Sequence, residues 1–228
     1  MSVAGEGTGF EQTIESHAAL VREVSCDVMV FPELSLTGYW LTADAVDPAD
    51  DRLAPLVAAC AEAETTALVG APVHEPGGLD HIAMLVVDAA GVRIGYRKIN
   101  VGADESHRFA PGAGPAVIDV DGWRLGLAIC RDTGIAEHAA QTAALGIDVY
   151  VAGVVDRPEH ADVQLERCRD MARRHATWVA VASAAGAAGS GFEVTAGRSF
   201  VLGPDGAVID RAGPDVGQVA RTTVTRRS

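Results

Sequence analysis

Residues 116–132 of the chain are Ala-Val-Ile-Asp-Val-Asp-Gly-Trp-Arg-Leu-Gly-Leu-Ala-Ile-Cys-Arg-Asp. Within this stretch, two apolar runs, 116–120 and 123–129, flank the pair Asp121-Gly122. An Asp-Gly pair between apolar runs is a strong indication of a β-hairpin, because glycine accepts the positive φ that the tight turn needs. The stretch therefore predicts two antiparallel strands, the second of which leads directly into Cys130.

Two further hairpins are predicted in the same way, from turn residues between apolar runs. Their turns are Ala89-Ala90-Gly91 and Pro204-Asp205-Gly206, and their paired runs are 82–88 with 92–99 and 199–202 with 207–209. Antiparallel strand pairs are therefore expected to supply much of the sheet structure.

Amphipathic helices and apolar strands follow one another through the rest of the chain. The predicted helices are 11–24, 53–64, 135–145 and 162–175, and the predicted strands are 27–31, 67–70, 147–152 and 178–183. Helices that alternate with strands in this way must cover the faces of a sheet. Two sheets packed face to face, with helices on the outside, would meet this requirement. A single central sheet remains possible. The Ala- and Gly-rich stretch 184–191 is predicted to be a mobile loop.

Size and composition limit the class of protein. The chain has 228 residues, of which 48% are hydrophobic and 21% charged, and it shows no internal repeat or linker. One folded domain over 1–228 is therefore expected. The formal net charge of −13 argues against nucleic acid or an anionic membrane surface as a partner. The longest apolar runs, such as 82–87, are far shorter than the about 20 residues that a membrane-spanning helix needs.

The N-terminus and the cysteines indicate where in the cell the protein is expected. Residues 1–13 have neither a basic start nor an apolar core, so no secretory signal is expected. The cysteines lie far apart with no C-x-x-C pair, and Cys26, Cys60, Cys130 and Cys168 are therefore expected to be free thiols. The cytoplasm is the expected location.

Three residues have side chains suited to catalysis, although each also has an ordinary structural interpretation. Glu33 follows an apolar strand across Pro32, where sheets present side chains to a crevice, but it could equally be a rim carboxylate. Lys98 lies near a strand end and could be an edge charge. Cys130 lies where a strand meets a following helix, whose first amides favour a thiolate; a buried structural cysteine is the alternative.

Taken together, four segments resemble the signature of the nitrilase, or carbon–nitrogen hydrolase, superfamily. They are Phe31-Pro-Glu-Leu-Ser-Leu-Thr-Gly-Tyr39, Gly95-Tyr-Arg-Lys98, Asp104-Glu-Ser-His-Arg-Phe-Ala-Pro-Gly112 and Gly126-Leu-Ala-Ile-Cys-Arg-Asp132. The order Glu, Lys, Cys is the order of the catalytic residues in that superfamily. The similarity extends from about residue 27 to a final strand expected near 217–224.

The resemblance implies an α/β fold: an α-β-β-α sandwich of two mixed, largely antiparallel-paired sheets with helices on the outer faces. It also implies assembly into homodimers or larger homo-oligomers. The implied reaction is hydrolysis of a non-peptide C–N bond in a small linear amide or N-carbamoyl compound, with release of ammonia. No cofactor or metal is expected, and the seven histidines show no H-x-x-x-H or H-E-x-x-H spacing that could bind zinc.

The resemblance also implies roles for particular residues. Glu33 would move protons, Lys98 would face the developing oxyanion, and Cys130 would form a thioester. Glu105 would orient Glu33 and the nitrogen of the substrate. The residues expected to contact the substrate are Arg131, Tyr39 and Glu137.

The chain departs from the superfamily pattern in two places. An apolar strand normally precedes the first helix, whereas residues 1–9 are polar and glycine-rich, so this strand is expected to be missing or degraded. Residues 131–136 also lack the aromatic-proline pair that is frequent before Glu137. These changes lie outside the three catalytic positions, so they leave the substrate open and the reaction type unchanged.

Three other functions remain open. A nitrilase would use the same three residues on a nitrile. A non-catalytic binding or scaffold relative would keep the fold and lose the chemistry. A redox-sensing thiol protein would need a resolving cysteine near Cys130, and none is close in sequence.

Overall fold

The computed structural model describes residues 9–75 and 77–225. The helices are α1 (Phe10–Val24), α2 (Ala54–Ala63), α3 (Ala136–Ala144) and α4 (Ala161–His175), with short 3₁₀ helices η1 (Asp51–Leu53), η2 (Glu105–His107), η3 (Cys130–Gly134) and η4 (Pro158–His160). The strands are β1 (Val28–Val30), β2 (Thr66–Glu75), β3 (Leu79–Asp88), β4 (Gly91–Arg97), β5 (Val117–Val120), β6 (Trp123–Ile129), β7 (Val149–Val154), β8 (Trp178–Ser183), β9 (Ala185–Gly186), β10 (Thr195–Ala196), β11 (Phe200–Leu202) and β12 (Val208–Arg211).

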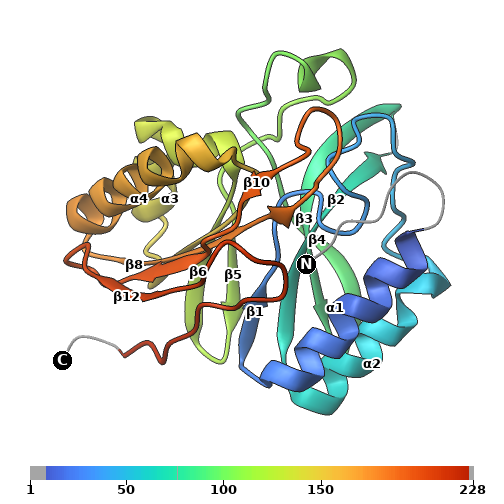
Figure 1. Ribbon diagram of the computed structural model, residues 1–228, viewed down its shortest axis with the longest axis horizontal. Helices are drawn as coiled ribbons and strands as arrows, with labels where there is room; N and C mark the ends of the chain where they lie inside the picture. Colours follow the sequence, from blue (N-terminus) through green and yellow to red (C-terminus); the bar gives the residue numbers. More distant parts are fainter. Residues whose placement is uncertain (1–8, 76, 226–228) are drawn as a thin grey trace.

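The strands form two main sheets that pack face to face (Figure 1). The strand order is β1-β2-β3-β4 in the first sheet and β12-β11-β8-β7-β6-β5 in the second. Strand pairs are antiparallel except for the parallel pairs β1–β2, β6–β7 and β7–β8. Helices α1 and α2 cover the first sheet, and α3 and α4 cover the second. The predicted α-β-β-α sandwich is therefore confirmed, and the single central sheet is ruled out.

The alternation of side chains along each strand divides the interior into three apolar layers. In β2, Leu68 packs between the sheets, whereas Val69 packs on the side of α1 and α2. In β7, Val151 packs between the sheets and Ala152 on the side of α4. Because both faces of these strands are covered, both must be apolar. The strands therefore appear in the sequence as nearly continuous apolar runs.

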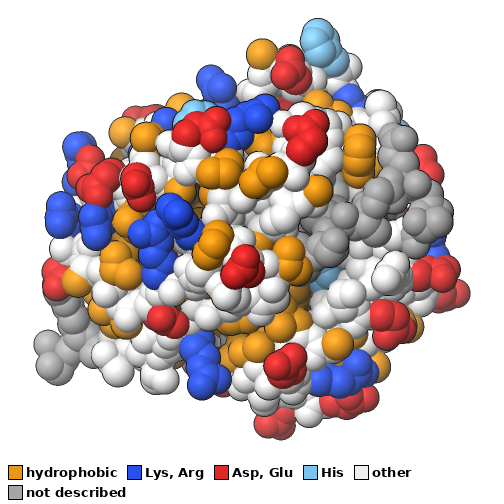
Figure 2. All heavy atoms as spheres, viewed as in Figure 1, with side chains coloured by type: hydrophobic (Ala, Val, Ile, Leu, Met, Phe, Trp, Pro, Cys, Tyr) orange, Lys and Arg blue, Asp and Glu red, His pale blue; other side chains and the backbone are white. Residues whose placement is uncertain are grey.

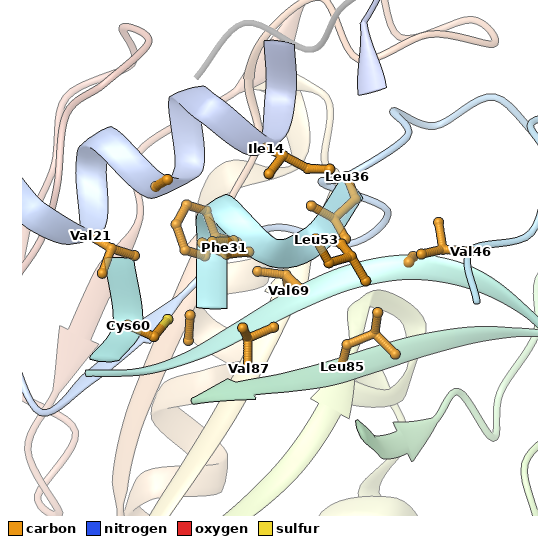
Figure 3. Close-up of a cluster of buried hydrophobic side chains, with 14 of the residues drawn as sticks. Ile14, Val21, Phe31, Leu36, Val46, Leu53, Cys60, Val69, Leu85 and Val87 are labelled. Carbon is orange, nitrogen blue, oxygen red and sulfur yellow. The ribbon is translucent and has the colours of Figure 1, made fainter. Parts of the chain in front are cut away.

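Figure 3 shows the layer beneath the first helix pair. Ile14 and Val21 of α1 and Cys60 of α2 lie over Val69 and Val87 of the sheet, and all five side chains are buried. Burying one aliphatic side chain of this size contributes about 1.5–3 kcal/mol. Short helices are marginal on their own, so this packing holds α1 and α2 in place.

The structure differs from the sequence prediction at three segments. Residues 217–224 contain no strand. The predicted loop 184–191 contains β9, which pairs with β10. Strand β2 continues past the predicted 67–70 and includes Pro72. Pro72 is tolerated because β1 has already ended, so no neighbouring strand on that side needs a hydrogen bond from its nitrogen. The carbonyl of Pro72 accepts a hydrogen bond from the main-chain N–H of Val46, which lies in a loop. The expected missing strand falls on residues 1–9, of which 1–8 lie outside the described residues.

The described residues contain no helix that is both long and apolar enough to cross a lipid bilayer. Figure 2 shows acidic and basic side chains interspersed over one face of the molecule, with hydrophobic side chains between them. This face therefore lacks the broad basic surface that is typical of nucleic-acid binding.

Two glycines allow the segment that carries Glu33 to pass between the sheets. A Cβ atom on Gly70 of β2 would lie 2.3 Å from the main-chain nitrogen of Leu34. A Cβ atom on Gly153 of β7 would lie 2.6 Å from the main-chain oxygen of Phe31. Residues 31–34 are therefore held between the two sheets at positions where a side chain would not fit.

Gly70→Ala is expected to lower the free energy of unfolding by about 1–3 kcal/mol, because the added methyl group would meet main-chain atoms that cannot rotate away. Urea unfolding followed by circular dichroism measures the change. Gly114→Ala is the matched control, since a Cβ atom there would meet nothing within 4 Å. Equal unfolding midpoints for the two variants would contradict the close packing at Gly70.

Candidate active site

The ammonium group of Lys98 is the centre of a buried ionic cluster. Its Nζ lies 2.7 Å from Oε1 of Glu33, and 2.7 and 2.8 Å from the two carboxylate oxygens of Glu105. The three side chains are 2%, 0% and 3% exposed, respectively. Charged side chains are almost never buried this fully unless they are paired. The structure therefore brings three of the predicted catalytic residues into direct contact.

Two of these residues, Glu33 and Lys98, lie just beyond a strand. Glu33 follows β1 across Pro32, and Lys98 directly follows the last residue of β4. The main chain of Lys98 is fixed on both sides, because its N–H donates to the carbonyl of Ile82 (2.8 Å) and its carbonyl accepts from the N–H of Gly112 (2.8 Å). The ammonium group is therefore held on a rigid main chain.

Glu105, in η2, has little remaining capacity to accept hydrogen bonds. Besides Lys98, it accepts from the main-chain N–H of Gly102 (2.6 Å) and from the hydroxyl of Tyr39 (2.6 Å). Burial favours its neutral form, but Lys98 and these donors outweigh burial, so the pKa of Glu105 is lowered. Glu105 therefore acts as a fixed negative charge that orients Lys98, and Tyr39 lies within the same cluster.

Cys130 lies at the end of β6 with its main chain in the left-handed region, at a φ of 44°. Its Sγ is 3.8 Å from the carbonyl oxygen of Val155. The thiol and the Glu33 carboxylate lie close enough that each affects the pKa of the other. The second carboxylate oxygen of Glu33, Oε2, is buried without a hydrogen-bond partner among the described residues. That oxygen is therefore available to accept a proton.

The pKa values of the two groups follow from burial. Burial raises the pKa of Glu33 to about 7, although the Lys98 charge opposes it. Burial also raises the pKa of the Cys130 thiol well above its usual value, and the charge of Glu33 adds to this effect. The expectation that a helix N-terminus favours the thiolate at Cys130 is therefore wrong. The five-residue η3 begins at Cys130 and α3 begins only at Ala136, so burial dominates.

The cation stays charged. Burial alone would lower the pKa of Lys98, but the negative charges of Glu33 and Glu105 outweigh burial and raise it. The site therefore combines a permanent positive charge, a neutral thiol and a carboxyl group that titrates near neutral pH. This combination suits general-base activation of a nucleophile and stabilisation of an oxyanion.

Two of the predicted substrate contacts lie elsewhere. The side chain of Arg131 is exposed, because η3 turns the buried side chains of Asp132 and Thr133 inward and this one outward. Glu137 is exposed on α3, where its carboxylate accepts a hydrogen bond from Gln141 (2.7 Å). The geometry does not bring either side chain to the ionic cluster.

Asp156 is a site residue that the sequence analysis missed. It directly follows Val155, whose carbonyl contacts the Cys130 thiol, and its negative charge contributes to the raised pKa of that thiol. Burial raises the pKa of Asp156, and its Oδ2 is buried without a hydrogen-bond partner among the described residues. An acid directly after the apolar run 149–155 was the signal that could have identified it.

The segment around β9 and β10 packs against Tyr39. The main-chain N–H of Tyr39 donates to the carbonyl of Ala188 (2.6 Å), and its ring meets the edge of Phe192 with 4.9 Å between centroids. Trp40 lies against Gly189, where a Cβ atom would be 2.7 Å from the indole ring. This segment therefore holds the residue that donates to Glu105.

A cavity of about 870 Å³ lies apart from this cluster, beside β1 and between β8, β11 and residues 215–224. None of the four clustered residues Glu33, Lys98, Glu105 and Cys130 lines it. Among the described residues, no group of three or more His, Cys, Asp or Glu side chains is arranged to hold a metal ion.

Comparisons with known proteins agree with the fold. A model of the carbon-nitrogen hydrolase family matches residues 3–227. The chain is 29% identical to the hydrolase in the pqqF 5′ region of Pseudomonas protegens, over 87% of this chain and 72% of that protein. It is 27% identical to an (R)-stereoselective amidase from a Pseudomonas species, over 83% of this chain and 70% of that protein. The fold is similar to the crystal structure of Saccharomyces cerevisiae Nit3, a member of branch 10 of the nitrilase superfamily. The match covers 93% of this chain and 84% of the Nit3 chain, with a TM-score of 0.82 and 17% sequence identity.

The fold is therefore that of the nitrilase superfamily. Because the family model matches nearly the whole length, this chain belongs to the carbon-nitrogen hydrolase family. It is an enzyme that hydrolyses carbon–nitrogen bonds other than peptide bonds.

Alkylation of Cys130 by iodoacetamide is expected to accelerate as the pH rises through about 7, because ionised Glu33, with its pKa raised to about 7, can then accept the thiol proton. At lower pH both groups hold their protons and the rate falls. Mass spectrometry of the labelled peptides follows each cysteine separately.

Glu33→Gln removes the proton acceptor and is expected to slow labelling of Cys130 by at least about tenfold near pH 8, without an inflection near pH 7. Glu62→Gln is the matched control, since Glu62 forms an exposed ion pair with Arg22. An unchanged pH profile in Glu33→Gln would show that Glu33 does not take the thiol proton.

Proposed function

We propose that this enzyme hydrolyses a small linear amide or N-carbamoyl compound through a thioester on Cys130 and releases ammonia. The observation that carries the proposal is the buried contact of Lys98 with Glu33 and Glu105, next to a neutral thiol whose proton Glu33 can accept. Amides are poor electrophiles, so two easier steps through a covalent intermediate are favourable.

In the first step, Glu33 accepts the thiol proton while Sγ of Cys130 attacks the carbonyl carbon. The negative charge that develops on the carbonyl oxygen is stabilised by the Lys98 ammonium and by a main-chain N–H after the nucleophile, assigned to Arg131. Glu33 then transfers the proton to the departing nitrogen. The C–N bond breaks, ammonia leaves, and the acyl group remains on sulfur as a thioester.

In the second step, a water molecule takes the place that ammonia has left and attacks the thioester. Glu33 accepts a proton from the attacking water, whose oxygen bonds to the thioester carbon. The same cation and N–H stabilise the oxyanion, the C–S bond breaks, and the proton returns to sulfur. Glu105 stays ionised throughout and keeps Lys98 in position. The carboxylic acid leaves, and the thiol is restored.

An amide is the favoured substrate class because one relative is an (R)-stereoselective amidase. A nitrilase reaction would use the same residues, with Sγ adding to the nitrile carbon. The remaining alternative is a non-catalytic relative, in which the ionic cluster would be a remnant. The contacts of Lys98 with both Glu33 and Glu105, together with the electrostatic effect of Glu33 and Lys98 on the Cys130 thiol, argue against that interpretation.

Ammonia release over short aliphatic amides, ω-amides of dicarboxylic acids, N-carbamoyl amino acids and aliphatic nitriles tests the proposal. The enzyme is expected to release ammonia from at least one amide or carbamoyl class, and Cys130→Ala is expected to lower that rate by at least about 10³-fold, since removing a covalent nucleophile ends the thioester route. Cys60→Ala is the matched control, because Cys60 lies on the buried face of α2, away from the site.

Three outcomes would count against the proposal. Ammonia release that survives in Cys130→Ala would dismiss the thioester. Faster release from nitriles than from the matching amides would favour a nitrilase. Absence of release from every class, together with slow labelling of Cys130, would favour the non-catalytic relative.

A further inference from the structure

The carboxylate of Asp132 lies two residues after the proposed nucleophile, with no exposed surface. Its two oxygens accept four hydrogen bonds. The donors are the main-chain N–H of Ile129 (3.0 Å) and the hydroxyl of Tyr96 (2.8 Å) on Oδ2, and the main-chain N–H (2.9 Å) and side-chain amide (2.8 Å) of Asn100 on Oδ1. An ionised carboxylate can accept all four, because it has two acceptor oxygens and no proton of its own.

These donors come from both sheets. Ile129 is the last residue of β6 and directly precedes Cys130. Tyr96 in β4 and Asn100 just beyond it lie two residues on either side of Lys98. A single carboxylate therefore joins the strand end that carries the thiol to the strand end that carries the ammonium group.

The main chain at Cys130 requires this support. A residue with a Cβ atom is disfavoured at a φ of 44° and keeps it only where its surroundings hold it. Asp132 holds the N–H of Ile129 on one side of the turn, and the hydroxyl of Thr133 donates to the carbonyl of Cys130 (2.7 Å) on the other. If the bond to Ile129 were lost, the turn could relax and Sγ would move away from Glu33.

A second set of buried groups fixes Tyr96. Tyr96 donates its hydroxyl proton to the carboxylate. In its hydrogen bond with Nε2 of His138, 2.9 Å away, the hydroxyl oxygen of Tyr96 must therefore be the acceptor. Burial lowers the pKa of His138, so its ring is neutral and Nδ1 accepts from the hydroxyl of Tyr150 (3.1 Å). This chain of hydrogen bonds runs from β7 through α3 to Asp132, and every member is buried.

We infer that Asp132 is a positioning residue, whose carboxylate sets the placement of the Cys130 thiol relative to Lys98 by binding Ile129, Asn100 and Tyr96 together. Asparagine has nearly the same shape but replaces one acceptor oxygen with an amide donor. In either orientation that donor faces a main-chain N–H, of Ile129 or of Asn100, and one of these bonds must break. The inference deepens the proposed function, because it takes Cys130 as the nucleophile.

The rate constant for alkylation of Cys130 near pH 8, measured on the folded protein, tests this inference without any substrate. Asp132→Asn is expected to slow alkylation by at least about tenfold, because a shift of about 1 Å in a reacting group can cost 10²-fold. Labelling of Cys26, which is half-buried outside the site, serves as the internal standard. With a hydrolysed amide, kcat is expected to fall by a similar factor, while KM changes by less than about threefold.

Leu56→Ala is the matched stability control, since Leu56 is fully buried on the inner face of α2, remote from the site. It should lower the melting temperature without slowing labelling of Cys130. Should Asp132→Asn fail to fold, Tyr96→Phe and Asn100→Ala each remove one donor and are expected to slow alkylation by about two- to fivefold.

Alkylation within twofold of the wild-type rate in folded Asp132→Asn would overturn the inference, as would unchanged rates in both single-donor variants. The result is also separable from the proposed function. Slowed labelling in a protein that hydrolyses no amide would support the positioning role while the hydrolase proposal failed. An unchanged kcat and labelling rate in an active amidase would overturn the positioning role alone.

Discussion

The buried ammonium group of Lys98 is the interaction on which the rest of the site depends. Taking charges out of water costs several kcal/mol per ion, and only close pairing with full hydrogen bonding offsets that cost. Lys98 meets this condition through Glu105, which is itself held by Gly102 and Tyr39. Glu33 shares the same cation but keeps one unpaired oxygen, so burial raises its pKa to about 7. Two glutamates that contact the same lysine therefore differ in pKa, which is raised for Glu33 and lowered for Glu105.

The two-sheet architecture explains why these groups meet. Glu33 and Lys98 follow strands of the four-stranded sheet, whereas Cys130 follows a strand of the six-stranded sheet. The apolar layer between the sheets excludes water from the region behind the cluster, which strengthens its electrostatic interactions. Any change in how the sheets pack would move the thiol relative to the carboxylate and the ammonium group, so the core and the chemistry are coupled.

Much of the fold followed from local patterns, because Asp-Gly turns and apolar runs depend on neighbouring residues. Glu33, Lys98, Glu105 and Cys130 were identified through a family resemblance, and the structure brings them together. Other features depend on contacts that sequence spacing does not reveal. Adjacent residues of η3 point in opposite directions, so only the fold shows that Arg131 is exposed while Asp132 is buried. Burial likewise raises the pKa of the Cys130 thiol. The helix N-terminus predicted at that position had indicated a thiolate instead.

In the proposed reaction, the acyl group of the substrate passes through the sulfur of Cys130. Rapid acid quenching of the enzyme during turnover of a hydrolysed amide, followed by peptide mass spectrometry, tests it most directly. The peptide containing Cys130 is expected to gain the mass of the acyl group, that is, of the amide less ammonia, and to lose it when hydroxylamine cleaves the thioester. Continued turnover with an acyl group on another residue, or with none on Cys130 under conditions where deacylation limits the rate, would contradict it.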